Sequence, residues 1–183
     1  MSELQSATEI RAYGLRNGLD RLFLNERFDT GLISSSGALC LDVAQGPEII
    51  ALSQFDPKPF FVSEGRRYPQ EISTNLSVKS APFFIGHEAL DALDFVSKYF
   101  PETRFGLITW INAYPSSLTA ENLMKFIKEV SGLVIEGGMV IVSDLFEASI
   151  ITTPVTKCGH LQFKIDNNKY AGIGRRIMIG RSI

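Results

Sequence analysis

Residues 38–48 constrain the fold of this chain more than any other part of the sequence. They begin with a short apolar run, pass through Asp42 and several small residues, and reach Pro47. The apolar run predicts a buried strand, and Pro47 predicts the first turn of a helix, where a backbone N–H has no intrahelical partner. An acid and a glycine at such a turn are typical of a site for a nucleotide-type ligand. A glycine lets the backbone approach that ligand closely, and the carboxylate of the acid accepts hydrogen bonds from the donor groups of the ligand.

Apolar runs and helical patterns alternate along the rest of the chain. After the strand at 38–42, strands are predicted over residues 60–63, 82–86, 105–111 and 139–144. Helices are predicted over residues 15–27, 47–54, 68–75, 90–100 and 119–133. The last of these has the clearest pattern, because Ser117 or Thr119 can cap it and apolar residues recur along one face. That face consists of Leu123, Phe126, Ile127 and Val130.

The remaining segments are predicted to be turns or polar ends. Residues 1–12 are polar and are expected to be mobile until they pack, and residues 34–37 and 136–138 are predicted to be turns. Two strands close the chain, over 160–165 and 176–179, with no helix between them. Such a pair is expected to be antiparallel and to lie at the edge of the sheet.

Strands alternating with helices predict an α/β fold with a mostly parallel sheet covered on both faces. We expect a three-layer sandwich whose seven-stranded sheet ends in an antiparallel C-terminal strand pair. The 183 residues fit a single domain, with a helical N-terminal segment at 1–37 and an α/β core at 38–183.

Composition narrows the function classes. The net charge of −2 and the pI near 5.7 offer no basic field for nucleic acid. No stretch reaches the roughly 18 apolar residues of a membrane span, and no signal peptide is visible. The two cysteines are far apart, and Cys40 lies in an apolar run, which favours a reducing compartment. We therefore expect a cytoplasmic protein that does not bind a membrane.

The order of these elements resembles that of the class I S-adenosylmethionine-dependent methyltransferases, from about residue 38 to 181. In that family the first strand ends in an acid and is followed by spaced glycines. Asp42 matches the acid, Gly46 matches the middle glycine, and Ala44 stands where the first glycine is usual. The resemblance implies that these three residues bind S-adenosylmethionine.

The same resemblance extends to the next three strands. Glu64, followed by Gly65, matches the acid that binds the ribose hydroxyls, and a carboxylate can accept from both hydroxyls of a diol. Glu88, followed by Ala89, matches the acid that meets the adenine amine. Trp110 is a candidate to line the pocket, although a single aromatic inside a strand more often belongs to the core.

Several positions depart from the family pattern. Ala44 adds a methyl group where backbone should approach the ligand, and Pro47 stiffens the turn. Where the family has a helix, the segment 145–157 contains a β-branched run at 150–156 that Pro154 interrupts. Residues 112–115 loosely resemble the Asn-Pro-Pro-aromatic turn of some N-methyltransferases, although a plain turn explains them better.

No general base and no methyl acceptor can be named from the residues. Two histidines and two scattered cysteines give no spacing for a metal site, so no metal is expected. The prediction is a methyltransferase with S-adenosylmethionine as cofactor and an unknown acceptor, as a monomer or as a homo- or hetero-oligomer. One alternative is a non-catalytic binding or scaffold domain that pairs with a partner protein. A nucleotide-dependent oxidoreductase fits less well, because Gly-x-Gly-x-x-Gly is missing after the first strand.

Overall fold

The structure is a computed structural model of the whole chain. It describes residues 3–36, 38–41, 51–52, 55, 60–62, 83–85, 89–113, 118–144, 156–167, 170, 172–174 and 176–183. The predicted helix at 68–75 and most of residues 145–157 lie outside the described residues. So does most of the helix at 47–54, of which Ala51 and Leu52 are described, helical and buried.

The described strands form one mixed sheet, in an α/β fold. Its order is β3-β2-β1-β4-β5-β8-β7-β6, parallel from β3 to β5 and antiparallel from β5 onward. The bounds are β1 Ala38–Leu41, β2 Phe60–Val62, β3 Phe83–Ile85, β4 Phe105–Ala113, β5 Val134–Asp144, β6 Lys157–Cys158, β7 Leu161–Asp166 and β8 Ile177–Ser182.

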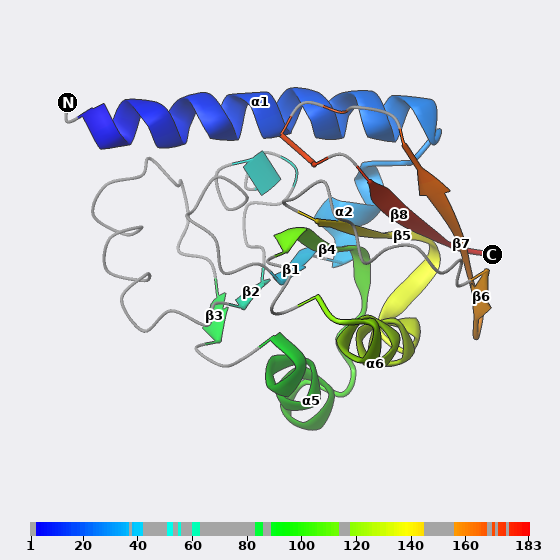
Figure 1. Cartoon of the computed structure of the whole chain (residues 1–183). Helices are drawn as coiled ribbons and strands as arrows, with labels where there is room; N and C mark the ends of the chain where they lie inside the picture. The colour runs from blue at the N-terminus through cyan, green and yellow to red at the C-terminus, as the bar shows by residue number, and fades with distance from the viewer. Residues whose placement is uncertain are drawn as a thin grey trace.

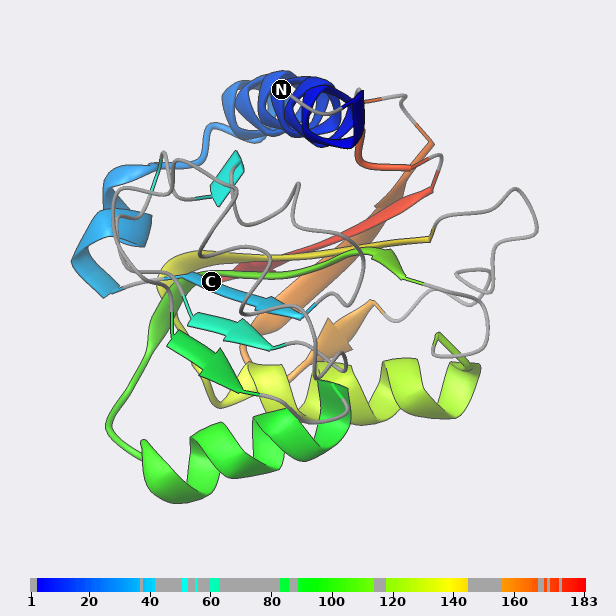
Figure 2. The same cartoon turned by 90° about the vertical axis from the view of Figure 1, so that its left-hand side faces the viewer.

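Helices lie on the two faces of this sheet (Figures 1 and 2). Their bounds are α1 Glu3–Asn25, α2 Gly31–Ser36, α5 Ala89–Tyr99 and α6 Ala120–Ser131. α1 runs across the strands on one face, and α5 and α6 lie on the other. Because successive residues of a strand point to opposite faces, each central strand contributes to both cores.

The two cores can be followed along β4. Leu107 and Ile111 belong to the cluster that includes α1 residues, whereas Ile108 and Trp110 belong to the cluster that includes residues of α5 and α6. Among the described residues, the α1-side cluster also takes in Leu15, Leu19, Leu22, Phe23, Ile33, Ala51, Leu52, Met139, Ile141, Ile177 and Ile179. The near-continuous apolar character of the central strands follows from burial on both sides.

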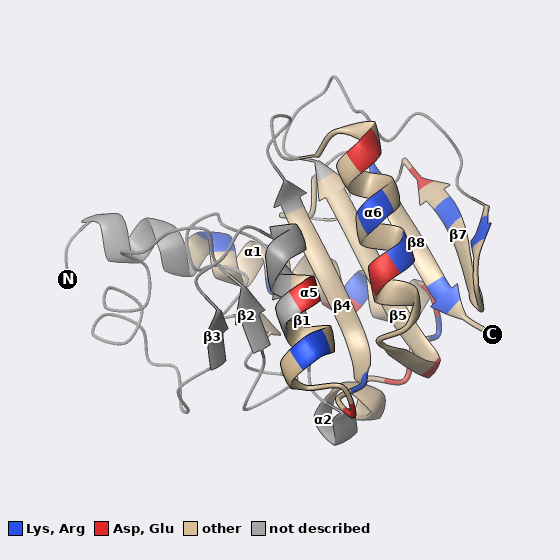
Figure 3. Cartoon of the chain, turned by 90° about the horizontal axis from the view of Figure 1, so that it is seen from below, with Lys and Arg blue, Asp and Glu red and all other residues tan. Residues whose placement is uncertain are grey.

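The prediction for α6 is confirmed in detail. Thr119 is the N-cap, and its hydroxyl accepts a hydrogen bond from the Asn122 backbone N–H at 3.1 Å. The buried face of the helix is the predicted one, Leu123, Phe126, Ile127 and Val130. Charged residues of both signs occur along this helix (Figure 3), and Glu121, Lys125 and Lys128 among them are exposed. The pattern was informative here because cap, amphipathicity and burial agree.

The predicted start of the first helix near Leu15 is wrong. α1 begins at Glu3 and runs for 23 residues, because residues 3–11 are mostly good helix formers and Ala12 is buried beyond them. The apolar pattern did not reveal this, since Ile10 and Tyr13 are 70% and 66% exposed. No described helix is long and apolar enough to cross a membrane.

The predicted turn at 34–37 is also wrong for its first three residues, which belong to α2. Leu32 and Ile33 explain this short helix: Ile33 is buried in the α1-side cluster and Leu32 packs against it. The side chain of Asp29 starts the helix by accepting a hydrogen bond from the Gly31 backbone N–H at 2.9 Å. Tertiary burial thus outweighs the turn preference of the serines that follow.

The predicted turn at 136–138 is a bulge inside β5, and this strand begins at Val134 rather than near 139. β4 advances from Phe105 to Leu107 while its partner advances from Val134 to Met139. Gly137 supplies the required backbone conformation, with φ at +76°. The glycine pair therefore interrupts a strand pairing that begins earlier than the apolar run.

The antiparallel C-terminal pair is confirmed as β7 and β8, which pair from Leu161 and Ser182 to Asp166 and Ile177. The two-residue strand β6 pairs with β7 at the sheet edge and comes in addition to the seven predicted strands. It is too short for its sequence pattern to reveal it, and it forms because a tight turn at Gly159, with φ at +58°, returns the chain against β7.

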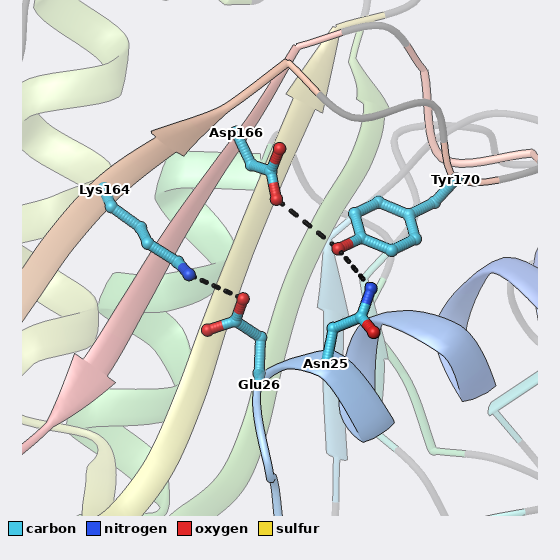
Figure 4. A network of polar contacts seen from close by, with 5 residues as sticks. All are labelled: Asn25, Glu26, Lys164, Asp166 and Tyr170. Atoms are coloured by element: carbon cyan, nitrogen blue, oxygen red, sulfur yellow. Dashed lines mark hydrogen bonds and ion pairs between the residues drawn. The ribbon is translucent and has the colours of Figure 1, made fainter.

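Polar contacts join the end of α1 to β7 (Figure 4). Asn25 Nδ2 donates to the Tyr170 hydroxyl at 3.2 Å, and that hydroxyl donates to Asp166 at 3.4 Å. Lys164 Nζ lies 2.6 Å from Glu26 Oε1, with the Glu26 side chain only 9% exposed. These contacts connect segments more than 130 residues apart in sequence and hold α1 on the sheet.

Glu26 also lies near a second cation. Arg181 of β8 places its guanidinium carbon 5.2 Å from the centroid of the Phe28 ring. Burial lowers the pKa of Arg181, and the Glu26 carboxylate opposes that effect. The Glu26 carboxylate therefore lies near two positive charges, those of Lys164 and Arg181, and partly neutralises both.

Glu26→Ala is expected to lower the free energy of unfolding by about 2 kcal/mol, because it leaves both cations without this counter-charge. Lys164→Ala should cost at most about 1 kcal/mol, since the Lys164 side chain is 56% exposed and Glu26 would still face Arg181. Urea unfolding of the two variants measures the difference. Equal losses of stability in the two variants would mean that the interaction between Glu26 and Arg181 does not stabilise the fold.

Candidate functional site

The centre of the sheet contains a topological switch point. β1 pairs with β2 on one side and with β4 on the other, all in parallel. The chain therefore leaves β1 in one direction along the sheet and later returns on the opposite side of it. Figure 2 shows the arrowheads of β1, β2, β3 and β4 pointing the same way. In open α/β sheets, ligands bind in the crevice outside the carboxyl ends of the strands at such a point.

The strands on one side of the switch point end level with each other. Leu41, the last residue of β1, pairs with Val62, and Val62 pairs with Ile85. Each end is followed within three residues by one of the predicted acids, Asp42, Glu64 or Glu88. The chain therefore enters all three acidic segments from the same edge of the sheet.

The predicted cofactor residues fall mostly outside the described residues. This holds for Asp42, Ala44, Gly46, Glu64, Gly65 and Glu88. Ala89 is described as the first residue of α5, on the segment that leaves β3 at the same edge. Their roles at the site remain predictions, and the described strands supply the positions from which these segments start.

Trp110 is the one predicted site residue whose side chain is described. It is 2% exposed and belongs to the core cluster beneath α5 and α6. Its ring centroid lies 5.1 Å from that of Phe126. These contacts favour the alternative that Trp110 is a core residue, and a role in lining the pocket remains a prediction.

Sequence reasoning missed Thr109, the neighbour of Trp110 in β4. Thr109 is fully buried, and its hydroxyl oxygen has no hydrogen-bond partner among the described residues. Leaving a buried hydroxyl unpaired costs about 1–3 kcal/mol. The available signal was a single hydroxyl residue between the apolar residues Ile108 and Trp110 of β4, close to the switch point.

The remaining titratable candidates lie elsewhere. His160 is exposed in the turn before β7, with its Nε2 atom 3.3 Å from the Val134 carbonyl oxygen. Val134 begins β5, so this histidine is at the opposite edge from the carboxyl ends of the parallel strands. His87 lies outside the described residues. Within the described part of the chain, no three His, Cys, Asp or Glu side chains are grouped to hold a metal ion.

No family model and no curated protein matches the sequence. Solved structures do match it. An S-adenosylmethionine-dependent methyltransferase from Clostridium acetobutylicum aligns with a TM-score of 0.50 at 18% identity, over 71% of this chain and 49% of that one. This chain thus spans about half the length of that protein.

Two further matches cover most of both chains. DesVI from Streptomyces venezuelae aligns with a TM-score of 0.58 at 10% identity, over 96% of this chain and 93% of that one. The Streptococcus mutans protein SMU.1697c, solved in complex with SAH, aligns with a TM-score of 0.55 at 10% identity, over 84% and 95%. The chain has the class I methyltransferase fold. At sequence identities this low, the matches show that the fold is shared.

Within the methyltransferase fold, the structure separates three groups of candidate residues. The acids that follow β1, β2 and β3 all leave one edge of the sheet. Thr109 lies inside the sheet at the switch point, and Trp110 packs on the opposite face from it. The carboxyl edge beside β1 and β4 is therefore the candidate site.

Proposed function

We propose that this protein is an S-adenosylmethionine-dependent methyltransferase whose acceptor is unknown. The observation that carries the proposal is the level ending of β1, β2 and β3 at the switch point, with a carboxylate within three residues of each end. The similarity to a methyltransferase and to a protein solved with SAH supports the same cofactor class.

The proposal includes a fold for the complete chain. We infer a single domain at 1–183, in which residues 1–37 form the N-terminal helical segment and 38–183 the α/β core, arranged as a three-layer sandwich around the seven predicted strands. The packing of α1 into a core shared with β4, β5 and β8 supports a single domain. A cytoplasmic location is part of the same proposal.

The residues at the site fit the cofactor chemically. Two acids can accept hydrogen bonds from donors of a nucleoside: Glu64 from the ribose hydroxyls and Glu88 from the adenine amine. Asp42, Ala44, Gly46 and Gly65 would form the turns beside them, and Ala89 begins a helix at that edge.

The bound cofactor supplies an electrophilic methyl group on a sulfonium, so the protein's own task is to bind, orient and exclude water. In this proposal the acids hold the nucleoside at the carboxyl edge of the sheet. Since positioning dominates this chemistry, the lack of an identifiable acid–base pair is compatible with it.

Calorimetric titration of the full chain with S-adenosylmethionine and S-adenosylhomocysteine tests the proposal. The wild type should bind both. Glu64→Ala should weaken S-adenosylhomocysteine binding about 30-fold, because it removes charge-assisted hydrogen bonds worth about 2 kcal/mol. Glu102→Ala is the matched control, since this exposed glutamate lies just before β4, at the opposite edge of the sheet.

Two other outcomes have distinct meanings. If the wild type binds neither compound at millimolar concentration, the proposal fails and the non-catalytic scaffold domain becomes the better reading. If Glu64→Ala binds as tightly as Glu102→Ala, the ribose site is wrongly assigned although the cofactor class stands.

A further inference from the structure

The outer face of α1 carries large apolar side chains. Ile10, Tyr13 and Leu24 are 70%, 66% and 78% exposed. With 3.6 residues per turn, these three residues and Asn17 fall within about 60° around the helix axis, opposite the leucines that enter the core. We call these four residues the outer stripe. A surface helix normally directs charged and polar residues outward, so apolar residues gathered in one stripe indicate a contact surface.

The outer stripe is accessible along its length. In Figures 1 and 2, α1 is the outermost helix on its side of the sheet, and no other described helix or strand lies beyond it. At a rise of 1.5 Å per residue, the stripe extends about 21 Å from Ile10 to Leu24. A helix of another protein chain can therefore lie against it.

The outer stripe is symmetric about Asn17. Ile10 precedes Asn17 by seven residues and Leu24 follows it by seven, while Tyr13 and Arg21 are each four residues away. A twofold contact uses the same patch on both copies, so residues at equal distances on opposite sides of its centre meet. An antiparallel second copy would thus place Ile10 against Leu24. It would also place Tyr13 level with Arg21, at a position suited to a cation–π contact.

The charges beside the outer stripe fit the same arrangement. Arg16 Nε lies 3.9 Å from Asp20 Oδ2, which is longer than a hydrogen bond, and the two side chains are 46% and 51% exposed. Arg16 precedes Asn17 by one residue and Asp20 follows it by three. In the antiparallel pair, Arg16 of one copy therefore lies about 3 Å along the helix axis from Asp20 of the other, on the same flank. A parallel copy would instead set like charges level with each other.

We propose that the outer stripe of α1 is the interface between two antiparallel copies of this chain. Both the apolar ends of the stripe and the charges on its flank are self-complementary in this orientation. The contact uses one helix from each copy and is small, so the dimer is reversible, with a Kd on the order of 10 μM. The inference does not depend on the proposed function, because it uses no residue of the candidate site.

Sedimentation velocity of the full chain, over about 1 to 200 μM, tests the inference. The mass should rise from 20.3 kDa toward twice that value. Leu24→Gln should raise the dimer Kd about 30-fold, because it removes an apolar contact at both ends of the interface. Its Tm at low concentration should stay within about 2 °C of the wild type, since Leu24 is exposed in the single chain. Met124→Gln is the matched control and should leave the Kd unchanged, since Met124 is 51% exposed on α6, on the other face of the sheet.

A charge exchange tests the antiparallel orientation. Arg16→Glu alone and Asp20→Arg alone place like charges across the contact, and each should raise the Kd about tenfold. A one-to-one mixture of the two variants should form mixed dimers with a Kd within about threefold of the wild type. Each chain in the mixture meets the opposite charge in the other, although each retains like charges at positions 16 and 20 of its own helix.

Three results would overturn the inference. A wild-type chain that stays monomeric at the highest concentration would show that a second copy does not cover the outer stripe. Equal Kd values for Leu24→Gln and Met124→Gln would show that the dimer forms through another surface. Failure of the two charge variants to form mixed dimers would exclude the antiparallel pairing of α1.

Discussion

Gly172→Ala is expected to lower the free energy of unfolding by about 3 kcal/mol. A Cβ atom at this position would lie 2.7 Å from both Cα and N of Leu15, which are backbone atoms of α1 and cannot rotate away. The residue also has φ at +75°, which disfavours any side chain. Thermal unfolding should show a Tm lower by roughly 6–12 °C for a chain of this size.

Gly159→Ala separates the two causes. Gly159 has φ at +58°, but a Cβ there would meet only the Ser131 side chain, at an ordinary 3.6 Å. This control should cost about 1 kcal/mol, the backbone strain alone. If both variants lose the same stability, close packing of α1 against residue 172 is not what holds that helix on the sheet.

Trp110→Ala is expected to cost about 3–5 kcal/mol, because it leaves a large cavity in the core beneath α5 and α6. The indole is almost fully buried, and its ring packs against Phe126. Chemical denaturation measures the loss. Tyr99→Ala provides a matched control, since Tyr99 is 57% exposed and its removal should change stability by about 0.5 kcal/mol or less.

The milder Trp110→Phe variant distinguishes a core role from a role in the pocket. As a core residue, Trp110 should tolerate phenylalanine with a loss of about 1–2 kcal/mol and no more than about a twofold change in the Kd for S-adenosylhomocysteine. A large rise in that Kd with little loss of stability would assign the indole to the cofactor pocket.

Much of the fold could be predicted from local patterns. Apolar runs indicated β4, the main part of β5 and the C-terminal pair, because their side chains are buried on both faces or at alternate positions. α6 was predicted with its cap and buried face, since the helix carries its own start signal and a clean amphipathic pattern. Each of these elements is determined by residues within its own length or directly beside it.

The errors have two causes. α1 begins earlier than predicted because residues 3–11 are mostly good helix formers, whereas the prediction relied on the apolar spacing that begins at Leu15. The glycine pair at 137 and 138 forms a bulge rather than a turn, because β4 extends alongside it. A glycine permits either conformation, and the neighbouring strand decides between them.

The candidate site divides in the same way. The residue types at Asp42, Glu64 and Glu88 were visible in the sequence, and the strand register shows why segments so far apart start from one edge. Trp110 and Thr109 are adjacent in sequence, yet strand alternation directs them to opposite cores. One packs against Phe126, whereas the other buries an unpaired hydroxyl.

The sequence by itself determined the α/β class, the order of its main strands and the acids expected at the site, because burial periodicity and turn chemistry are local properties. Only the tertiary structure decided the bulge in β5, the extra strand β6 and the burial of the Thr109 hydroxyl without a hydrogen-bond partner among the described residues. Each of these depends on contacts between residues distant in the chain, and no local pattern encodes such contacts.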